Sequence, residues 1–407
     1  MTAMTNPSWA RVRGPLAPYV DGVRAELERL GYTPLTAAAH VRLMAHLSRW
    51  LARHGVEASG LTPATVDAYF AQRRAAGYVG QVTGRALQPL LGHLQRLGVV
   101  SPPVPVAPAS PQERLLAQYR DYLTTERGLT TTTAALNVRM VRPFLADQAR
   151  MRQGRLDLEQ LTAGEVAAFV VAQGRQRPKS VKRMVTALRS LLGFLHVEGI
   201  VDQPLATAVP SVAGWTQTGL PKALDAEQVA ALLASCDERT ATGRRDLAIL
   251  TLLVRLGLRA GEVAALSLQD IDWRCGEITV RGKGNRHDRL PLPADVGQRI
   301  VAYLRDGRPQ STQDRAVFVR AQAPYRALTS NAVTTVVACA GRRAGLGVIG
   351  AHRLRHSAAT AMLRSGGSLT EIGQTLRHVR PLTTAMYAKV DIQALRQLAR
   401  PWPGEAP

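Results

Sequence analysis

The sequence predicts a mainly α-helical protein that carries one small β-sheet in its C-terminal half. Apolar residues recur at helical spacing along most of the chain, whereas residues 277–281 and 288–292 alternate like a pair of strands. Two proline-rich stretches, 101–111 and 204–221, are typical of extended linkers. A chain of 407 residues is longer than a single domain with one hydrophobic core usually is, so we expect several folded parts. They are helical modules at 1–100 and 112–203, a mixed domain at 222–400 and a tail at 401–407.

The two helical modules look like copies of each other. Residues 31–42 match residues 128–139 at seven positions, and later matches follow at offsets of 100 and 101. A shared threonine, Thr33 or Thr130, opens the second helix of each copy, and an arginine, Arg42 or Arg139, follows it. We expect four short helices in each copy, with loop insertions accounting for the drift in offset.

The pattern changes at about residue 222. Apolar helical runs occupy 225–235, 244–256 and 260–267, and the alternating strand pair follows them. A Gly-Lys-Gly-Asn turn joins the two strands, and further helical runs complete the domain. A mainly helical domain with a small sheet is therefore expected here.

The formal net charge of +22 at pH 7 indicates an anionic partner. Such a charge opposes compaction by self-repulsion unless a polyanion shares the surface, so we expect double-stranded DNA to bind. An arginine-rich proteome without a polyanion is the alternative, and the first module could also serve packing or protein contacts. The candidate DNA-contact residues are Arg42, Arg139, Arg175, Arg177, Lys179, Lys182 and Arg183.

Several other classes of protein are disfavoured. Three cysteines, Cys236, Cys275 and Cys339, lie far apart without a CxxC pair, which argues against disulfides and a zinc site. Neither a carboxylate cluster for Mg²⁺ nor a P-loop for ATP is evident, so we expect no metal and no cofactor. No run reaches about 18 apolar residues and no signal pattern opens the chain, which predicts a cytoplasmic, nucleoid-associated bacterial protein away from membranes.

Six residues in the C-terminal half suit the chemistry of breaking and resealing a phosphodiester bond. A tyrosine nucleophile, Tyr387, would keep the bond energy in a covalent link that a second hydroxyl can reverse. Planar guanidinium forks stabilise the extra negative charge of the phosphorane, and His352 can accept the tyrosine proton or position the phosphate. The set comprises Arg259, Lys283, His352, Arg355, His378 and Tyr387.

Lys283 is notable because only five of the 52 basic residues are lysines. The leaving 5′-oxygen needs a proton, which a lysine can supply and an arginine cannot. His378 would donate a hydrogen bond to a phosphate oxygen. Glu262, one turn after Arg259, either orients that guanidinium or a neighbouring histidine, or favours the helix N-terminus through the dipole.

These residues and their contexts resemble the catalytic set of the tyrosine recombinases, the phage integrase family. The contexts are LGLRAGEVAAL, EITVRGKGNRHDRLPL, AHRLRHSAAT and EIGQTLRHVRPLTTAMYAKV. The resemblance spans roughly residues 113–398 and implies a core-binding helical module followed by a catalytic domain. The position of His356 is generally supporting in that family, which leaves it outside the catalytic set. The module before residue 101 departs from the simpler family pattern and puts its own role in doubt.

The resemblance implies a site-specific recombinase or integrase that forms a 3′-phosphotyrosyl intermediate without metal or ATP. It further implies a homotetramer on two DNA sites, possible accessory recombinases and service to a mobile element. A monomeric type IB topoisomerase shares this chemistry, but the duplicated helical modules argue against it. A non-catalytic DNA-binding accessory protein is the other alternative, and the complete set of six residues argues against that.

Overall fold

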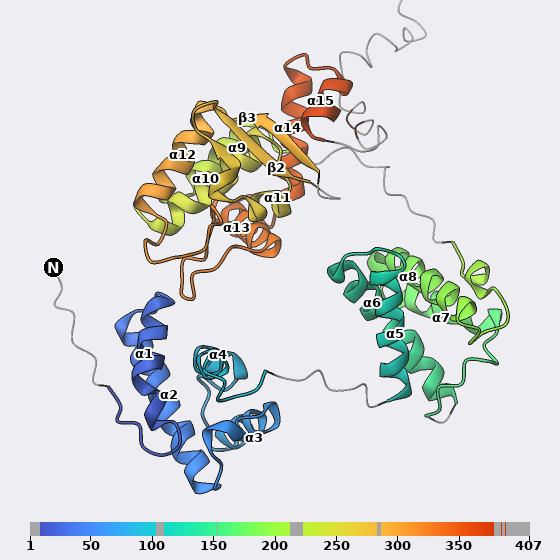
Figure 1. Ribbon diagram of the computed structural model, residues 1–407. Coiled ribbons are helices and arrows are strands. Elements are labelled where there is room, and N and C mark those ends of the chain that lie inside the picture. Colours follow the sequence, from blue (N-terminus) through green and yellow to red (C-terminus); the bar gives the residue numbers. More distant parts are fainter. Residues whose placement is uncertain are drawn as a thin grey trace, which may run out of the picture. The chain divides into compact units, whose positions relative to one another are not determined.

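The computed structural model describes residues 9–102, 110–152, 154–211, 223–282, 286–377, 384 and 387 (Figure 1). The chain divides into two compact units, one formed by Met1–Pro103 with Gly219–Pro407 and the other by Val104–Thr218. Helices dominate the described residues, and the strands among them form one three-stranded sheet, so the predicted fold class is confirmed. No helix in the described part is long and apolar enough to cross a membrane.

The N-terminal module encloses its own apolar core. Leu27, Val41, Leu47 and Leu94 are among its fully or almost fully buried members. The module is made of α1 (Val20–Arg29), α2 (Pro34–Arg53), α3 (Pro63–Ala75) and α4 (Gln88–Arg96) (Figure 1).

The second module repeats the helix sequence of the first. Its core includes Tyr119, Phe144 and Leu195. The predicted linker at 204–221 starts later than expected, because the 3₁₀ helix η4 (Leu205–Ala208) follows directly and Leu205 and Val209 are buried in this core. The helices are α5 (Pro111–Thr125), α6 (Thr131–Met151), α7 (Ala163–Gln176) and α8 (Pro178–Val197).

Matching threonines start matching helices in the two modules. Thr33 caps α2 by accepting the Thr36 N–H at 3.4 Å, and Thr130 caps α6 by accepting the Thr133 N–H at 3.3 Å. The prediction of four short helices per module was wrong in length for the second helix of each module and for α8, which holds 20 residues. Helices α2 and α6 hold 20 and 21 residues, because their buried residues continue along one face beyond the region of sequence matching.

The C-terminal part surrounds α10 (Ala241–Arg255), whose middle residues Ala248, Ile249 and Leu250 are completely buried. The antiparallel strands β1 (Ile271–Asp272), β2 (Glu277–Arg281) and β3 (His287–Pro291) follow in the order β1-β2-β3, and β1 was not predicted because it has only two residues. The other helices are α9 (Ala226–Ala234), α11 (Ala260–Ala265), α12 (Ala294–Asp306), α13 (Ser330–Arg343), α14 (Ala351–Arg364) and α15 (Leu369–Thr375).

Candidate active site

Gly257 brings Arg259 to the start of helix α11. The backbone at Gly257 has a φ of 59°, which favours glycine, and a Cβ there would lie 2.5 Å from Cδ2 of Leu376. Helix α10 therefore ends at Arg255, the chain turns, and Arg259 becomes the N-cap residue of α11. The side chain of Arg259 is 43% exposed, so its guanidinium can reach a ligand outside the protein.

Glu262 holds Arg259 in place. Its Oε2 accepts the backbone N–H of Arg259 at 2.8 Å, and its Oε1 accepts Nη1 of the same residue at 2.5 Å. Burial acts to raise the pKa of the carboxyl, but these bonds and the Arg377 and Arg259 charges bring the pKa below its ordinary value. Glu262 therefore contacts both the guanidinium of Arg259 and the first turn of α11, and its role in the reaction stays a prediction.

Arg355 is almost completely buried, with 2% of its surface exposed. It lies on α14, donates from Nη1 to the Gly257 carbonyl at 2.6 Å, and donates from Nη2 to the Leu376 carbonyl. Burial, followed by the charge of Arg259, lowers its pKa to about 10, so the guanidinium remains charged at neutral pH. These bonds tie the turn before Arg259 to the end of α15 through one cation.

Two histidines stand one turn apart on α14. The rings of His352 and His356 lie 4.3 Å apart in an edge arrangement, and Nδ1 of His356 is 2.9 Å from the hydroxyl of Tyr387. The imidazole that contacts the tyrosine is therefore His356, the neighbour left outside the expected catalytic set. Its own pKa is lowered to about 4 by burial, His352 and Arg355, so the ring is neutral at pH 7 and available as an acceptor.

Tyr387 is 1% exposed and packs with Ala359, Ile372 and Leu376. Burial raises the pKa of its hydroxyl, while the Arg355 charge acts in the opposite direction. The pKa of His352 is lowered by desolvation and then by Arg355 and Arg259. A neutral imidazole beside a protonated phenol is the arrangement that general-base activation requires.

Two expected catalytic residues, Lys283 and His378, lie outside the described residues. The two strands on either side of Lys283, β2 and β3, are described. They pair antiparallel, and the register runs from Glu277 opposite Pro291 to Arg281 opposite His287. Gly282 then donates its N–H to the Arg286 carbonyl at 2.7 Å, which brings the two ends of the turn together.

The candidate DNA-contact residues are spread over both units. Lys179 lies on α8, but its side chain is outside the part of the chain that the structure describes. The others are exposed: Arg42, Arg139, Arg175, Arg177, Lys182 and Arg183. In the described ranges no group of three or more His, Cys, Asp or Glu residues is arranged to hold a metal ion.

Two residues that contact the site were not among the expected catalytic residues: His356 was set aside as supporting, and Arg377 was missed. His356 had a detectable signal, because it is four residues after His352 and helical spacing puts both rings on one face. Arg377 had none: it adopts a φ of 57° and ion-pairs with Glu262, which is 115 residues earlier in the chain.

Comparison with known proteins identifies the class to which this fold and site belong. Residues 222–394 match the phage integrase family. The protein called integrase/recombinase y4rA of Sinorhizobium fredii is 38% identical over 97% of this chain and 96% of its own length. The chain therefore belongs to the tyrosine recombinases of the phage integrase family, which are enzymes of site-specific DNA recombination.

More distant relatives agree with this assignment. Tyrosine recombinase XerD of Mycobacterium tuberculosis is 30% identical over 72% of this chain and 97% of its own length. The recombinase XerH, solved in a post-cleavage complex with a palindromic difH substrate, shares the fold with a TM-score of 0.54 and 16% identity, covering 98% of this chain and 99% of that structure.

Proposed function

We propose that this chain recombines DNA by joining a DNA 3′-phosphate to Tyr387, in the service of a mobile element. The observation that carries the proposal is the meeting of Tyr387, His356 and two arginines. The tyrosine hydroxyl contacts His356 Nδ1 at 2.9 Å, and the charge of Arg355 acts on the same hydroxyl. Gly257 accepts from Arg355 two residues before Arg259, which brings both guanidinium groups to one turn.

The proposed reaction exchanges one phosphoester bond for another. The Tyr387 oxygen attacks the scissile phosphorus and loses its proton to the neutral imidazole of His356, which requires the tautomer with its own proton on Nε2. The bond from phosphorus to the 5′-oxygen breaks, and a 5′-hydroxyl leaves. Attack by the 5′-hydroxyl of a second strand on the phosphotyrosine reverses these steps and reseals DNA, so the bond energy is conserved.

The arginines supply charge where the phosphorane develops it. The side chain of Arg259 is 43% exposed and lies beside the buried carboxylate of Glu262. The guanidinium of Arg355 is instead held by hydrogen bonds to the backbone carbonyls of Gly257 and Leu376. A pre-fixed guanidinium stabilises a transition state more than a mobile one because no reorganisation is needed during the reaction. His352 and His378 would add hydrogen bonds to the non-bridging oxygens.

Lys283 is proposed as the acid that protonates the leaving 5′-oxygen. The paired strands β2 and β3 end on either side of this segment, and Gly282, directly before Lys283, has no side chain that would obstruct a close approach to DNA. Lysine can release a proton whereas arginine stays charged, so the chemistry favours Lys283 over the many arginines of the chain.

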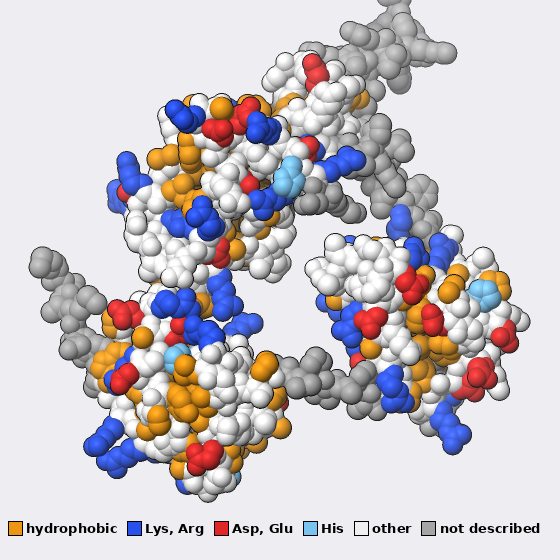
Figure 2. Space-filling view, in the orientation of Figure 1, with side chains coloured by type: hydrophobic (Ala, Val, Ile, Leu, Met, Phe, Trp, Pro, Cys, Tyr) orange, Lys and Arg blue, Asp and Glu red, His pale blue; other side chains and the backbone are white. Residues whose placement is uncertain are grey.

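The N-terminal module is proposed to read DNA through one face of α2. Arg42, Arg49 and Arg53 are exposed and recur at helical spacing along this helix. None of the three forms an ion pair within the described residues, so the face presents uncompensated positive charge. Lys and Arg side chains are spread over the visible face of each unit in Figure 2.

A second group of side chains extends this face. His46 lies on α2 next to Arg49, its ring is 5.6 Å from that of Tyr78, and the Arg73 guanidinium lies 3.9 Å from the Tyr78 ring centre. Tyr78 is 45% exposed, which suits stacking against a sugar or base. We name the set Arg42, His46, Arg49, Arg53, Arg73 and Tyr78 the α2 face.

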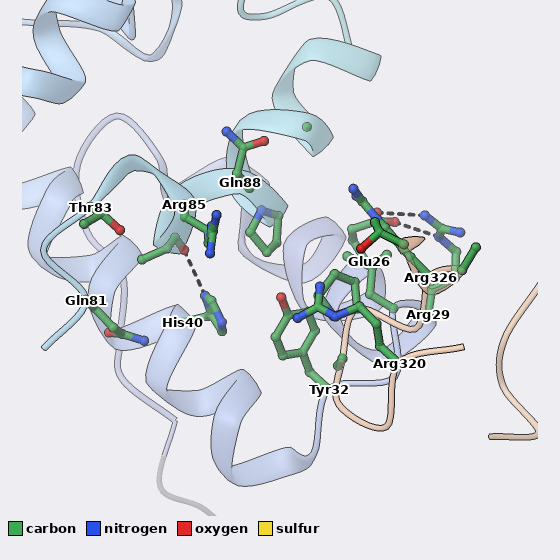
Figure 3. A pocket seen from close by; sticks show the side chains of 18 of the residues that line it. Glu26, Arg29, Tyr32, His40, Gln81, Thr83, Arg85, Gln88, Arg320 and Arg326 are labelled. Carbon is green, nitrogen blue, oxygen red and sulfur yellow. Dashed lines mark hydrogen bonds and ion pairs between the residues drawn. The ribbon is translucent and has the colours of Figure 1, made fainter. Parts of the chain in front are cut away.

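Glu26, which lines the pocket drawn in Figure 3, is an ion-pair partner for two arginines. Its carboxylate lies 2.8 Å from the guanidinium of Arg29 and 2.8 Å from that of Arg96. Figure 3 also shows His40, whose Nδ1 is 3.1 Å from the Ala86 carbonyl, beside Tyr32. Arg29 and Arg96 are thus already paired with a carboxylate, unlike the three arginines of α2 in the described part of the chain.

Exchange between two duplexes requires four strand cuts, which a homotetramer on two sites supplies, with or without accessory recombinases. Incubating the purified protein with two labelled duplexes in EDTA and without ATP tests this function. Recombinant duplexes are expected from the wild type and not from Tyr387→Phe. Relaxation of supercoiled DNA without any recombinant product would instead support the topoisomerase alternative.

A further inference from the structure

Arg377 occupies a backbone conformation that favours glycine. It follows α15, and its φ of 57° lies in the left-handed region, which costs free energy for a residue with a Cβ. Its side chain is nevertheless 8% exposed, so the guanidinium is turned into the protein and not toward solvent. A strained backbone that positions a buried cation calls for a functional explanation.

The guanidinium of Arg377 has contacts on three sides. Nη2 donates to Glu262 Oε2 at 2.7 Å, and Nη1 donates to the Thr375 carbonyl at 3.3 Å. Nε lies 3.8 Å from Asp288 Oδ2 and has no hydrogen-bond partner, which leaves an ion pair that closes with a small movement. Arg377 therefore connects α11 with the β2–β3 hairpin.

Each of these contacts leads to a residue of the proposed chemistry. Glu262 holds Arg259 through Oε1 and Oε2. Asp288 pairs with Val280 across the hairpin, and its Oδ2 is 3.9 Å from the position that a Cβ on Gly282 would take, one residue before Lys283. A line of charges runs from the phosphate-binding arginine to the turn that carries the proposed acid.

The balance of charge strengthens this interpretation. Glu262 alone with Arg259 would form a neutral pair and weaken the attraction of Arg259 for a phosphate. With Arg377 as the second cation on the same carboxylate, Glu262 is shared between two arginines, and Asp288 lies farther from Arg377, at 3.8 Å. Arg377 can thus orient Glu262 without sacrificing the charge that Arg259 presents to DNA.

We propose that Arg377 is a positioning residue that links Glu262 to Asp288 and so holds Arg259 and the β2–β3 hairpin in a fixed relation for cleavage. This inference rests on the proposed function of Lys283 and Tyr387. Two effects are expected from losing Arg377: Arg259 is held less firmly, and the hairpin is released. Asp288→Asn should produce only the second, because Glu262 keeps both cations.

The test measures how fast the full-length protein forms the covalent adduct in a single turnover on a nicked DNA site. Two substrates are compared, one with an oxygen and one with a sulfur at the 5′ bridging position of the scissile phosphate. A thiolate leaves without a proton, so the sulfur substrate removes the need for the acid. The variants are Arg377→Gly, which also relieves the backbone, Arg377→Lys and Asp288→Asn. Arg364→Ala serves as the matched control, since Arg364 is exposed at the end of α14.

Arg377→Gly is expected to slow cleavage of the oxygen substrate about 10–100-fold, the usual effect of losing a residue that orients a ligand group. Sulfur should restore only part of this loss. Asp288→Asn should be slower on oxygen and recover to within about twofold of the wild type on sulfur. Arg377→Lys should fall between the wild type and Arg377→Gly, because it keeps the charge and loses the fork.

The proposal is overturned if Arg377→Gly and Asp288→Asn cleave both substrates at the wild-type rate. It is also overturned if Asp288→Asn loses equal activity on oxygen and sulfur, because the hairpin would then act on something other than the leaving group. Should Arg377→Gly fail to fold in a thermal unfolding scan, Asp288→Asn and Arg377→Lys carry the test. If the wild-type protein forms no adduct on either substrate, the proposed function itself is refuted. That result is distinct from the two outcomes that overturn the role of Arg377.

Discussion

Nδ1 of His356 lies 2.9 Å from the hydroxyl of Tyr387, which is buried, whereas His356 is half-buried. A nucleophile paired with a neutral imidazole is primed to lose its proton once a phosphate arrives. The partner of the tyrosine is thus a histidine one helical turn beyond His352, within the same α14. In the proposed reaction, Nδ1 of His356 is therefore the proton acceptor.

Replacing His356 with Asn keeps a polar group of similar shape and removes the base. Cleavage should slow by about 10²-fold or more, because general-base catalysis contributes on that scale. The rate of adduct formation on a nicked site measures the effect. His196→Asn is a matched control, since His196 bonds a backbone carbonyl in the second module. Wild-type rates in His356→Asn would show that its contact with Tyr387 is only packing.

The stability of the protein should depend on His356 in acid. The pKa of His356 is about 4 in the folded protein, whereas an unfolded histidine titrates near ~6.5. The unfolded state therefore binds the proton more strongly, so this contribution to stability is complete above ~pH 6.5 and is lost as the pH falls toward 4. Urea unfolding at neutral and acid pH should show a steeper loss for the wild type than for His356→Asn. Parallel curves would contradict the assignment.

Arginine-to-lysine changes test the guanidinium forks. Arg259→Lys keeps the charge and loses paired donation, so cleavage should fall by about 10²-fold or more while DNA binding changes little. Arg355→Lys should also lower the unfolding temperature, because one ammonium cannot replace both bonds to the Gly257 and Leu376 carbonyls. Near-normal cleavage rates in both variants would reduce these arginines to generic cations.

The α2 face is tested by changing three arginines together. Arg49→Gln, Arg53→Gln and Arg73→Gln should shorten the DNA footprint and reduce the dependence of log Kd on log salt by about three units if each contacts one phosphate. Arg24→Ala is the control, because Arg24 pairs with Asp21 at 3.1 Å. An unchanged footprint together with lost bridging of two sites would assign the first module to protein contacts.

Much of the fold could be read from the sequence because it depends on local signals. Strand alternation placed β2 and β3 within one residue of their observed bounds, and threonine N-caps marked α2 and α6. The sequence did not show where the second module ends, because burial of Leu205 and Val209 is set by tertiary packing and not by composition. The division of the chain into functional domains stays a prediction.

The candidate site was only partly readable for a similar reason. Residue type and spacing singled out Tyr387, Arg259 and Arg355, since few side chains suit that chemistry. The contacts of Arg377 with Glu262 and Asp288 join segments separated by 115 and 89 positions, and no local pattern encodes such a meeting. The roles of all six expected catalytic residues, of Glu262 and of the DNA-contact residues stay predictions.

Peptide mapping of the covalent protein–DNA adduct tests the central claim most directly. The protein is trapped on a nicked site, digested with nuclease and protease, and the modified peptide is sequenced by mass spectrometry. The account predicts a phosphonucleotide on Tyr387, and no adduct from Tyr387→Phe despite DNA affinity within a few fold of the wild type. An adduct on any other residue, or one that persists in Tyr387→Phe, would contradict it.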